Sequence, residues 1–202
     1  MNQNAHMQRV GATVLTDTSN VRIKPWYEYY SKNGTPHDNA RLFYIKGIRK
    51  LLRAQGFTEE KVRLYSEIPT IESEWDPLAI NKYSGAAGLW QITPSTYVLF
   101  GGHLRDIHDP YKSSIVAVRL LKYLDSTFQG NKVLVLFAYN AGAPRVVAAL
   151  KRINTSDPWQ VKFKNETYSF APKIYGATLA RLNKLWNTKS TYNQKRLGIE
   201  NR

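Results

Sequence analysis

Cysteine is absent from the 202 residues of this chain. Its absence excludes disulfide bonds, thiolate metal sites and a cysteine nucleophile. Long apolar runs are missing too, since the longest, VLVLFA at residues 133–138, is far shorter than a membrane-spanning helix requires. The first residues, MNQNAHMQRVGATVL, contain neither an apolar stretch of signal-peptide length nor a cleavage site, so we expect no secretory leader in this chain.

Acidic residues are few, with 15 Asp and Glu against 29 Lys and Arg, and the formal net charge is +14. An excess of this size attracts polyanions through the summed electrostatic field. Nucleic acid, anionic lipid, lipopolysaccharide and a carboxylate-bearing cell wall all qualify as partners. The chain has no recognised nucleic-acid-binding motif, so we rank a nucleic-acid binder last and expect no such partner.

Several common catalytic motifs are also absent. The four histidines do not form the HExxH zinc pattern, and the chain has neither a G-x-S-x-G elbow nor a phosphate-binding G-x-x-x-x-G-K-[ST] loop. Loop histidines such as those in GGHLRDIHD are more often surface residues than metal ligands. We therefore expect no metal and no cofactor, and the carboxylates are the remaining candidates for chemistry. The histidines are His6, His37, His103 and His108.

Apolar residues recur at helical spacing through most of the chain. This periodicity predicts a helix over 40–56 and a second one that Thr58 caps, that Pro69 kinks or breaks, and that ends before Pro77. The apolar stripe of the second helix would include Leu64, Ile68, Ile71 and Trp75.

Further helices are expected from Asp109-Pro110 to Gly130, over the buried segment NKVLVLFAYNAG, over APRVVAALKRI, and from about Glu166 to Trp186. Earlier in the chain, the aromatics of WYEYYSKNGTPHDN at 26–39 would form either a clasp on the domain or, with less support, a platform for sugars. The prediction is a mainly α single domain of six to eight helices, with at most a small β-hairpin in the glycine-rich segment 81–88.

Two glutamates near the end of the second predicted helix are candidates for an acid catalyst. Glu72 and Glu74 lie at opposite edges of the apolar stripe, so periodicity does not choose between them. The nearby Trp75, Leu89 and Trp90 are able to form a wall of low dielectric constant. Such a wall raises the pKa of a glutamate and keeps it protonated near neutral pH, as a general acid requires.

Three blocks of sequence, in order, resemble the lytic transglycosylases that share the goose-type lysozyme fold, and most of all the membrane-bound murein transglycosylase D type. The blocks are IESEWDPLAINKYSGAAGLWQITPST at 71–96, FAYNAGAPRVVAAL at 137–150 and ETYSFAPKI at 166–174. The resemblance covers about residues 60–186 and implies a lysozyme-like fold. One residue departs from the family pattern, because Phe170 stands where the family usually has tyrosine.

The resemblance implies that Glu72 is the catalytic acid and that peptidoglycan glycan strands are the substrate. It places Ser73, Gln91, Tyr139 and Asn140 along the sugar-binding groove, with Glu166 bracing or contacting the same site. It further implies a single-carboxylate mechanism that forms a 1,6-anhydromuramyl end without metal or cofactor. A hydrolytic muramidase of the same fold would need a second carboxylate, for which the sequence offers Glu67, Glu74, Asp76 and Asp106.

From the resemblance we expect an N-terminal extension and first helix over 1–57, a catalytic domain over 58–186, and a basic C-terminal tail over 187–202. We expect a monomer that acts at the bacterial cell wall, in the periplasm or envelope. Without a leader, the chain would be a trimmed enzyme, an excised domain, or a wall-degrading protein of a phage or secretion system. A non-catalytic wall-binding module is the alternative outside the enzyme class.

Overall fold

The computed structural model describes residues 20–35, 38–153, 157–161, 163 and 166–196. Within these ranges the chain forms nine α-helices and two short 3₁₀ helices. Antiparallel bridges of Ala87 with Ile80 and with Ile92 are the extended pairing found in the glycine-rich segment. The mainly α fold predicted from the sequence is confirmed, although the described helices outnumber the six to eight expected.

The helices follow one another closely along the chain. They are α2 (Lys24–Asn33), α3 (Asp38–Ala54), α4 (Glu59–Tyr65), α5 (Ile68–Glu72), α6 (Pro94–Leu99), η1 (Leu104–Asp106), α7 (Pro110–Thr127), α8 (Lys132–Ala141), α9 (Ala143–Ile153), η2 (Pro158–Gln160) and α10 (Glu166–Arg196). In the described part of the chain no helix combines the length and the apolar character needed to cross a membrane.

Helix starts follow the capping residues that the sequence displays. The Thr58 side chain accepts a hydrogen bond from the Lys61 backbone N–H at the start of α4, and Asp109 accepts from two backbone N–H groups at the start of α7. Asn131 caps α8 in the same way, so NKVLVLFAYNAG is a helix despite its β-branched residues, as predicted.

Two predicted helix ends were wrong. The break expected near Pro69 is present, since α4 ends at Tyr65 and α5 begins at Ile68, but α5 ends at Glu72 and does not continue toward Pro77, because the backbone leaves helical geometry at Ser73. The last helix, expected to end near Trp186, continues to Arg196 and therefore covers most of the predicted tail; residues 197–202 lie outside the described residues. No glycine or proline occurs between Trp186 and Arg196 to stop it.

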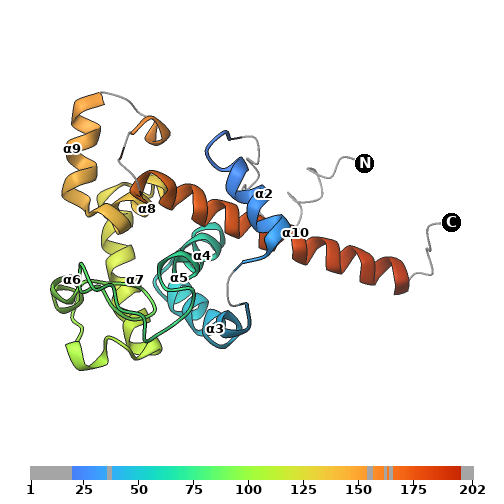
Figure 1. Ribbon diagram of the computed structural model, residues 1–202, viewed down its shortest axis with the longest axis horizontal. Helices are drawn as coiled ribbons and strands as arrows, with labels where there is room; N and C mark the ends of the chain where they lie inside the picture. The colour runs from blue at the N-terminus through green and yellow to red at the C-terminus, as the bar shows by residue number, and fades with distance from the viewer. Residues whose placement is uncertain (1–19, 36–37, 154–156, 162, 164–165, 197–202) are drawn as a thin grey trace.

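Helix α10 is the axis of the molecule. It packs against α2, α4, α5 and α8, while α3 packs against α4 and α7, and its C-terminal half extends beyond the body (Figure 1). The core holds large side chains that are fully buried, among them Trp75, Trp90, Tyr97, Phe137 and Phe170. The short helix α5, which ends at Glu72, is thereby held between α10 and the rest of the core.

Helix α2 belongs to the same body, although it precedes the region that resembles the transglycosylases. A Cβ atom at Gly176 would lie 2.6 Å from the Trp26 Cβ, so only glycine lets α2 approach α10 this closely. Arg22, just before α2, donates to the carbonyls of Trp159 and Tyr168 and lies over the Tyr168 ring at 3.8 Å. The aromatic segment therefore packs as a clasp, which was the first of the two expectations. Residues 1–19 of the predicted extension lie outside the described residues.

Candidate active site

The two candidate glutamates lie in different environments. Glu72 is the last residue of α5, and the backbone then takes positive φ angles at Glu74 (52°) and Trp75 (70°). The Trp75 backbone N–H donates to the Pro69 carbonyl at 3.2 Å, which closes this turn. As a result Glu72 is half-buried, Trp75 is buried and Glu74 is exposed.

Enclosure changes the acidity of Glu72. Burial of its carboxyl group, followed by the nearby charge of Glu166, raises the pKa of Glu72 from the ordinary 4.5 to about 8. At neutral pH the group is therefore mostly protonated and able to donate a proton. Glu74, the other candidate that periodicity left open, lies on the far side of the turn at 73–75 and is exposed to solvent. The turn therefore separates it from Glu72.

The segment Leu89–Trp90 connects two of the predicted site residues. The Ser73 hydroxyl donates to the Leu89 carbonyl at 2.7 Å, and the Tyr139 hydroxyl donates to the Trp90 carbonyl at 2.8 Å. Both Leu89 and Trp90 are fully buried. The residue after the acid and the tyrosine of α8 are thus held by adjacent carbonyls of one buried segment.

Gln91 follows this segment with a positive φ of 46°. Its amide nitrogen donates to the carbonyls of Ala79 and Gly88, at 3.0 and 2.9 Å, and so closes the loop. Gly88 is required here, because its φ is +74° and a Cβ would lie 2.2 Å from the Ile107 carbonyl oxygen. The side chain of Gln91 shapes the loop beside the acid, and its contact with a sugar stays a prediction.

The end of α8 meets the start of α10 at the site. Asn140 accepts a hydrogen bond from the Thr167 hydroxyl at 2.6 Å, and Glu166 is the first residue of α10. Burial, and next the charge of Glu72, raise the pKa of Tyr139 well above its ordinary value. The charge of Glu166 thus acts on Glu72, and the charge of Glu72 acts on Tyr139, so the three groups lie near one another.

Phe170 packs where the resemblance predicts a tyrosine. Its ring is almost fully buried and stacks on Tyr139, with centroids 6.3 Å apart and planes 6° from parallel. The missing hydroxyl leaves an apolar surface beside Tyr139, and this surface adds to the enclosure of the site.

The other carboxylates considered from the sequence are occupied elsewhere. Glu67 is buried among arginines, Asp106 pairs with Lys112 at 2.9 Å, and Asp76 accepts from the Leu78 backbone N–H at 2.8 Å. The carboxylate whose charge acts on Glu72 is Glu166, which the sequence reasoning treated as a brace and did not weigh as a second acid. Its position at the first turn of the last helix was the available signal.

The histidines give no metal-binding group in the described residues. No three His, Cys, Asp or Glu side chains gather there in a way that could hold a metal ion. His108 lies with its Nδ1 3.0 Å from the Pro77 carbonyl oxygen, a contact that joins the loop before α7 to the turn after Glu74. His6 and His37 lie outside the described residues.

Comparison with known proteins finds several relatives. The family model described as transglycosylase SLT domain matches residues 53–162, more than half of the chain. Membrane-bound lytic murein transglycosylase D of Escherichia coli K12 is 33% identical over 115 residues, which are 53% of this chain and 25% of that protein. The protein of the same name from Escherichia coli O6:H1 gives the same values. The chain therefore spans about a quarter of the length of these relatives.

Among solved structures, the 70 kDa soluble lytic transglycosylase of Escherichia coli superposes with a TM-score of 0.56. The superposition covers 86% of this chain and 30% of that one, at 20% sequence identity. At this level of identity the likeness concerns the fold. It extends beyond the residues that the family model matches.

Proposed function

The chain belongs to the transglycosylase SLT domain family, and from this membership we propose that it cleaves peptidoglycan. The bond cleaved is the β-1,4 bond between N-acetylmuramic acid and N-acetylglucosamine. The observation that most supports this proposal is the enclosed Glu72, whose pKa of about 8 suits a general acid at neutral pH. The murein transglycosylases that it resembles support the choice of substrate.

Glu72 acts first as an acid and then as a base. Its proton goes to the glycosidic oxygen, and the positive charge that develops at the anomeric carbon is relieved by the acetamido group of the muramic sugar. The ionised Glu72 then accepts the proton of the C6 hydroxyl of the same sugar, whose oxygen attacks the anomeric carbon. The product carries a 1,6-anhydromuramyl end, and an intramolecular attack of this kind has a large effective concentration.

The remaining site residues position the sugar around Glu72. Tyr139 and Ser73 are held on the Leu89–Trp90 segment, so they keep Glu72 in a fixed, enclosed place. Gln91 and Asn140 line the groove from the two sides, and the charge of Glu166 adds to the rise in the pKa of Glu72 that burial causes. This arrangement needs no metal and no cofactor.

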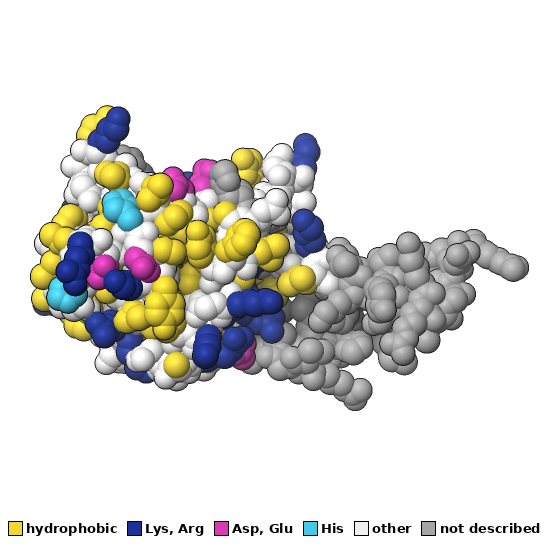
Figure 2. Space-filling model, turned by 90° about the horizontal axis from the view of Figure 1, so that it is seen from below, with side chains coloured by type: hydrophobic (Ala, Val, Ile, Leu, Met, Phe, Trp, Pro, Cys, Tyr) yellow, Lys and Arg dark blue, Asp and Glu magenta, His cyan; other side chains and the backbone are white. Residues whose placement is uncertain are grey.

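The charge of the protein suits its proposed place of action. Lys and Arg side chains are spread over the face seen in Figure 2, and the chain carries a formal charge of +14. Peptidoglycan carries the carboxylates of its peptides, and long-range attraction would bring the protein to the wall. We propose that it acts there as a monomer, in the periplasm or the surrounding envelope.

The product decides between transglycosylation and hydrolysis. We expect a digest of purified peptidoglycan, analysed by mass spectrometry, to yield anhydromuramyl ends, which are about 18 Da lighter than hydrolytic ends by one water. Reducing ends would contradict the proposed mechanism and identify a muramidase. Hydrolysis by a muramidase would need a second carboxylate to activate water, and Glu166, whose charge acts on Glu72, is the candidate for it. A folded protein that binds the wall without releasing products would be a binding module.

The pH dependence of the reaction should report the raised pKa of Glu72. Because the acid must be protonated, kcat/KM should be maintained below the pKa of about 8 and should fall as the pH rises through it. Glu166→Gln removes a negative charge that raises this pKa, so the alkaline limb should move to lower pH. Rates on soluble glycan strands between pH 5 and 10 would measure the alkaline limb of the unaltered protein and of Glu166→Gln. An alkaline limb that does not move in Glu166→Gln would contradict the coupling between the two carboxyl groups.

A further inference from the structure

A cleft of about 230 Å³ opens beside α5, the helix that ends at the proposed acid, outside the residues assigned to the sugar groove. One wall comes from α2, which contributes Trp26, Tyr29 and Tyr30; the other walls come from α5, the turn after it and α10. The lining residues there are Thr70, Ile71, Glu74 and Lys173. Thr70 and Ile71 belong to α5, which ends at Glu72, so the cleft lies against the helix that carries the proposed acid.

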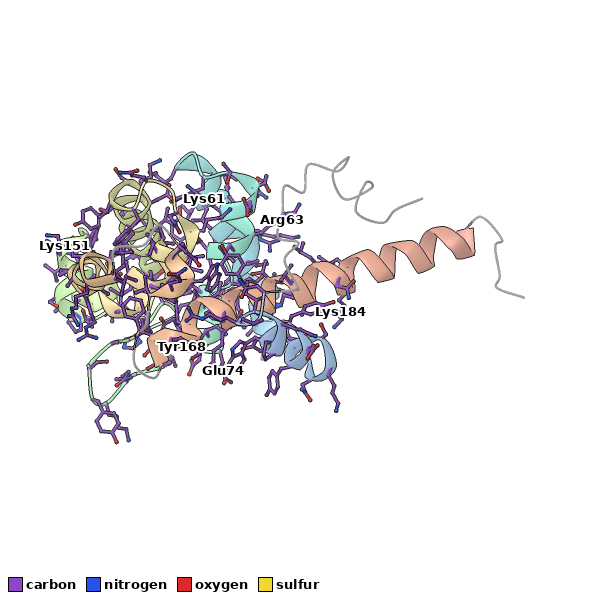
Figure 3. The ribbon with its side chains drawn as sticks, turned by 90° about the horizontal axis from the view of Figure 1, so that it is seen from above. Lys61, Arg63, Glu74, Lys151, Tyr168 and Lys184 are labelled. Atoms are coloured by element: carbon purple, nitrogen blue, oxygen red, sulfur yellow. The ribbon has the colours of Figure 1, made fainter. Side chains whose placement is uncertain are left out.

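The cleft carries charges of both signs. Glu74 is exposed, and in Figure 3 it lies between α2 and the first turns of α10, on the side that carries Tyr168. Burial and next the neighbouring Tyr29 raise the pKa of Tyr30 to about 12, and the charge of Glu74 contributes to this rise. Lys173, half-buried, holds its ammonium 4.8 Å from the centre of the Trp26 ring. A carboxylate and an ammonium therefore share one aromatic cleft.

The aromatic rings of the cleft are not arranged as a stacking platform for sugars. Lys173 covers one face of Trp26, and the Trp26 backbone and Cβ pack closely on Gly176. Tyr29 meets Tyr30 edge to face, with centroids 5.3 Å apart, and the Tyr30 side chain is buried. Sugar binding uses open, flat aromatic faces, whereas these rings form the apolar sides of a pocket with charged groups at its ends.

We propose that this cleft binds the peptide that the muramic sugar carries, with a carboxylate of the peptide at Lys173 and an amino group at Glu74. The proposal rests on the function proposed above, because the glycan at Glu72 brings the peptide to the cleft. The volume is below the range of about 300–1,000 Å³ typical of pockets for drug-sized ligands, and it suits one or two amino-acid residues. Helix α2, which precedes the matched family region, would thereby give the enzyme a preference for peptide-bearing strands.

The test compares two substrates, glycan strands with intact peptides and the same strands after an amidase has removed the peptides. Lys173→Met keeps most of the length of the side chain and removes its charge. In this variant the ratio of kcat/KM on intact strands to kcat/KM on peptide-free strands should fall about tenfold, the loss expected for one charge-assisted hydrogen bond. Tyr29→Ala should lower the ratio in the same direction, and since Tyr29 is 54% exposed this variant should fold.

Lys24→Met is the matched control, because Lys24 lies on α2, is exposed and pairs with Glu28 at 3.8 Å. Its ratio should equal that of the unaltered protein. An equal loss on both substrates in Lys173→Met and Tyr29→Ala would overturn the proposal in favour of a saccharide contact, and so would no loss on either. Failure of the unaltered protein to cleave either substrate would instead overturn the proposed function itself, and the peptide site with it.

Discussion

Glu72→Gln should lower the rate of peptidoglycan cleavage by about 10³- to 10⁴-fold. The same carboxyl group is proposed to donate a proton in the first step and accept one in the second, so the amide interrupts both. The measurement is the release of soluble products from purified peptidoglycan at pH 7, with unaltered protein and variant at equal concentration. Binding to the wall should persist, because the basic surface is unchanged.

Glu74→Gln is the comparison that makes this result specific. Glu74 is two residues away but lies on the other side of the turn at 73–75, exposed to solvent. Its substitution should cost less than about tenfold, since at most it loses one contact with a peptide. An active Glu72→Gln together with an inactive Glu74→Gln would contradict the assignment of the acid.

The stability of Glu72→Gln provides a check that the loss is chemical. A carboxyl group whose pKa is raised from 4.5 to about 8 in the folded protein contributes stability that is present below the lower value and is lost as the pH rises through the higher one. Each pH unit between these values costs about 1.4 kcal/mol, and glutamine does not titrate. The difference in Tm between the variant and the unaltered protein should therefore be more favourable to the variant at pH 9 than at pH 5. A variant that is less stable at both pH values would mean that the substitution damages the fold.

The sequence predicted the starts of several helices well because the signals for a helix start are local. The caps at Thr58, Asp109 and Asn131 and the spacing of apolar residues act within a few residues of one another. The end of α5 could not be predicted in the same way, since two non-glycine residues with positive φ, Glu74 and Trp75, form the turn. Periodicity assumes that the helix continues, and it cannot register a turn held by a hydrogen bond back to Pro69.

The sequence indicated which residues to consider for the candidate site, and it did not indicate the contacts between them. The order of the blocks around Glu72, Tyr139 and Glu166 indicated which residues to consider, but their roles remain predictions. The structure adds that Ser73 and Tyr139 are held by neighbouring carbonyls and that Asn140 is joined to Thr167. These contacts join residues up to 49 positions apart, and no local pattern encodes them.

The buried charge at Glu67 was missed for the same reason. Glu67 was weighed as a second catalytic carboxylate, yet its side chain is 1% exposed and is surrounded by Arg41, Arg49 and Arg181. Burial would raise the pKa of Glu67, but the charges of Arg181 and Arg41 outweigh it and hold the pKa below its ordinary value. The group is therefore ionised at neutral pH and unsuited to donate a proton.

This cluster connects α3 and α10 to α5, the helix that carries the proposed acid. Arg41 on α3 lies 2.6 Å from one Glu67 oxygen, and Arg181 on α10 contacts the other. The Thr70 hydroxyl donates to Glu67 at 3.0 Å and accepts from the Trp75 indole N–H at 3.0 Å. The chain of contacts thus begins before α5 and ends just after it, on both sides of Glu72.

Glu67→Gln should lower the free energy of unfolding by about 3–5 kcal/mol, because it leaves arginine charges buried without their partner. At about 2–4 °C per kcal/mol for a chain of this length, Tm should fall by roughly 10 °C. Differential scanning calorimetry at pH 7 measures both quantities. Well below Tm the folded variant should still cleave peptidoglycan, which separates a structural role of Glu67 from a catalytic one.

Glu59→Gln applies the same substitution to an exposed ion pair and is the matched control. Glu59 lies 2.5 Å from Arg53, and both side chains are about half exposed, so the pair should contribute no more than about 1 kcal/mol. The difference in Tm between the two variants isolates the effect of burying the ion pair, because both substitutions replace glutamate by glutamine. Similar Tm values for Glu67→Gln and Glu59→Gln would show that the buried cluster does not hold α3, α5 and α10 together. A full loss of cleavage by a folded Glu67→Gln would return Glu67 to the list of catalytic carboxylates.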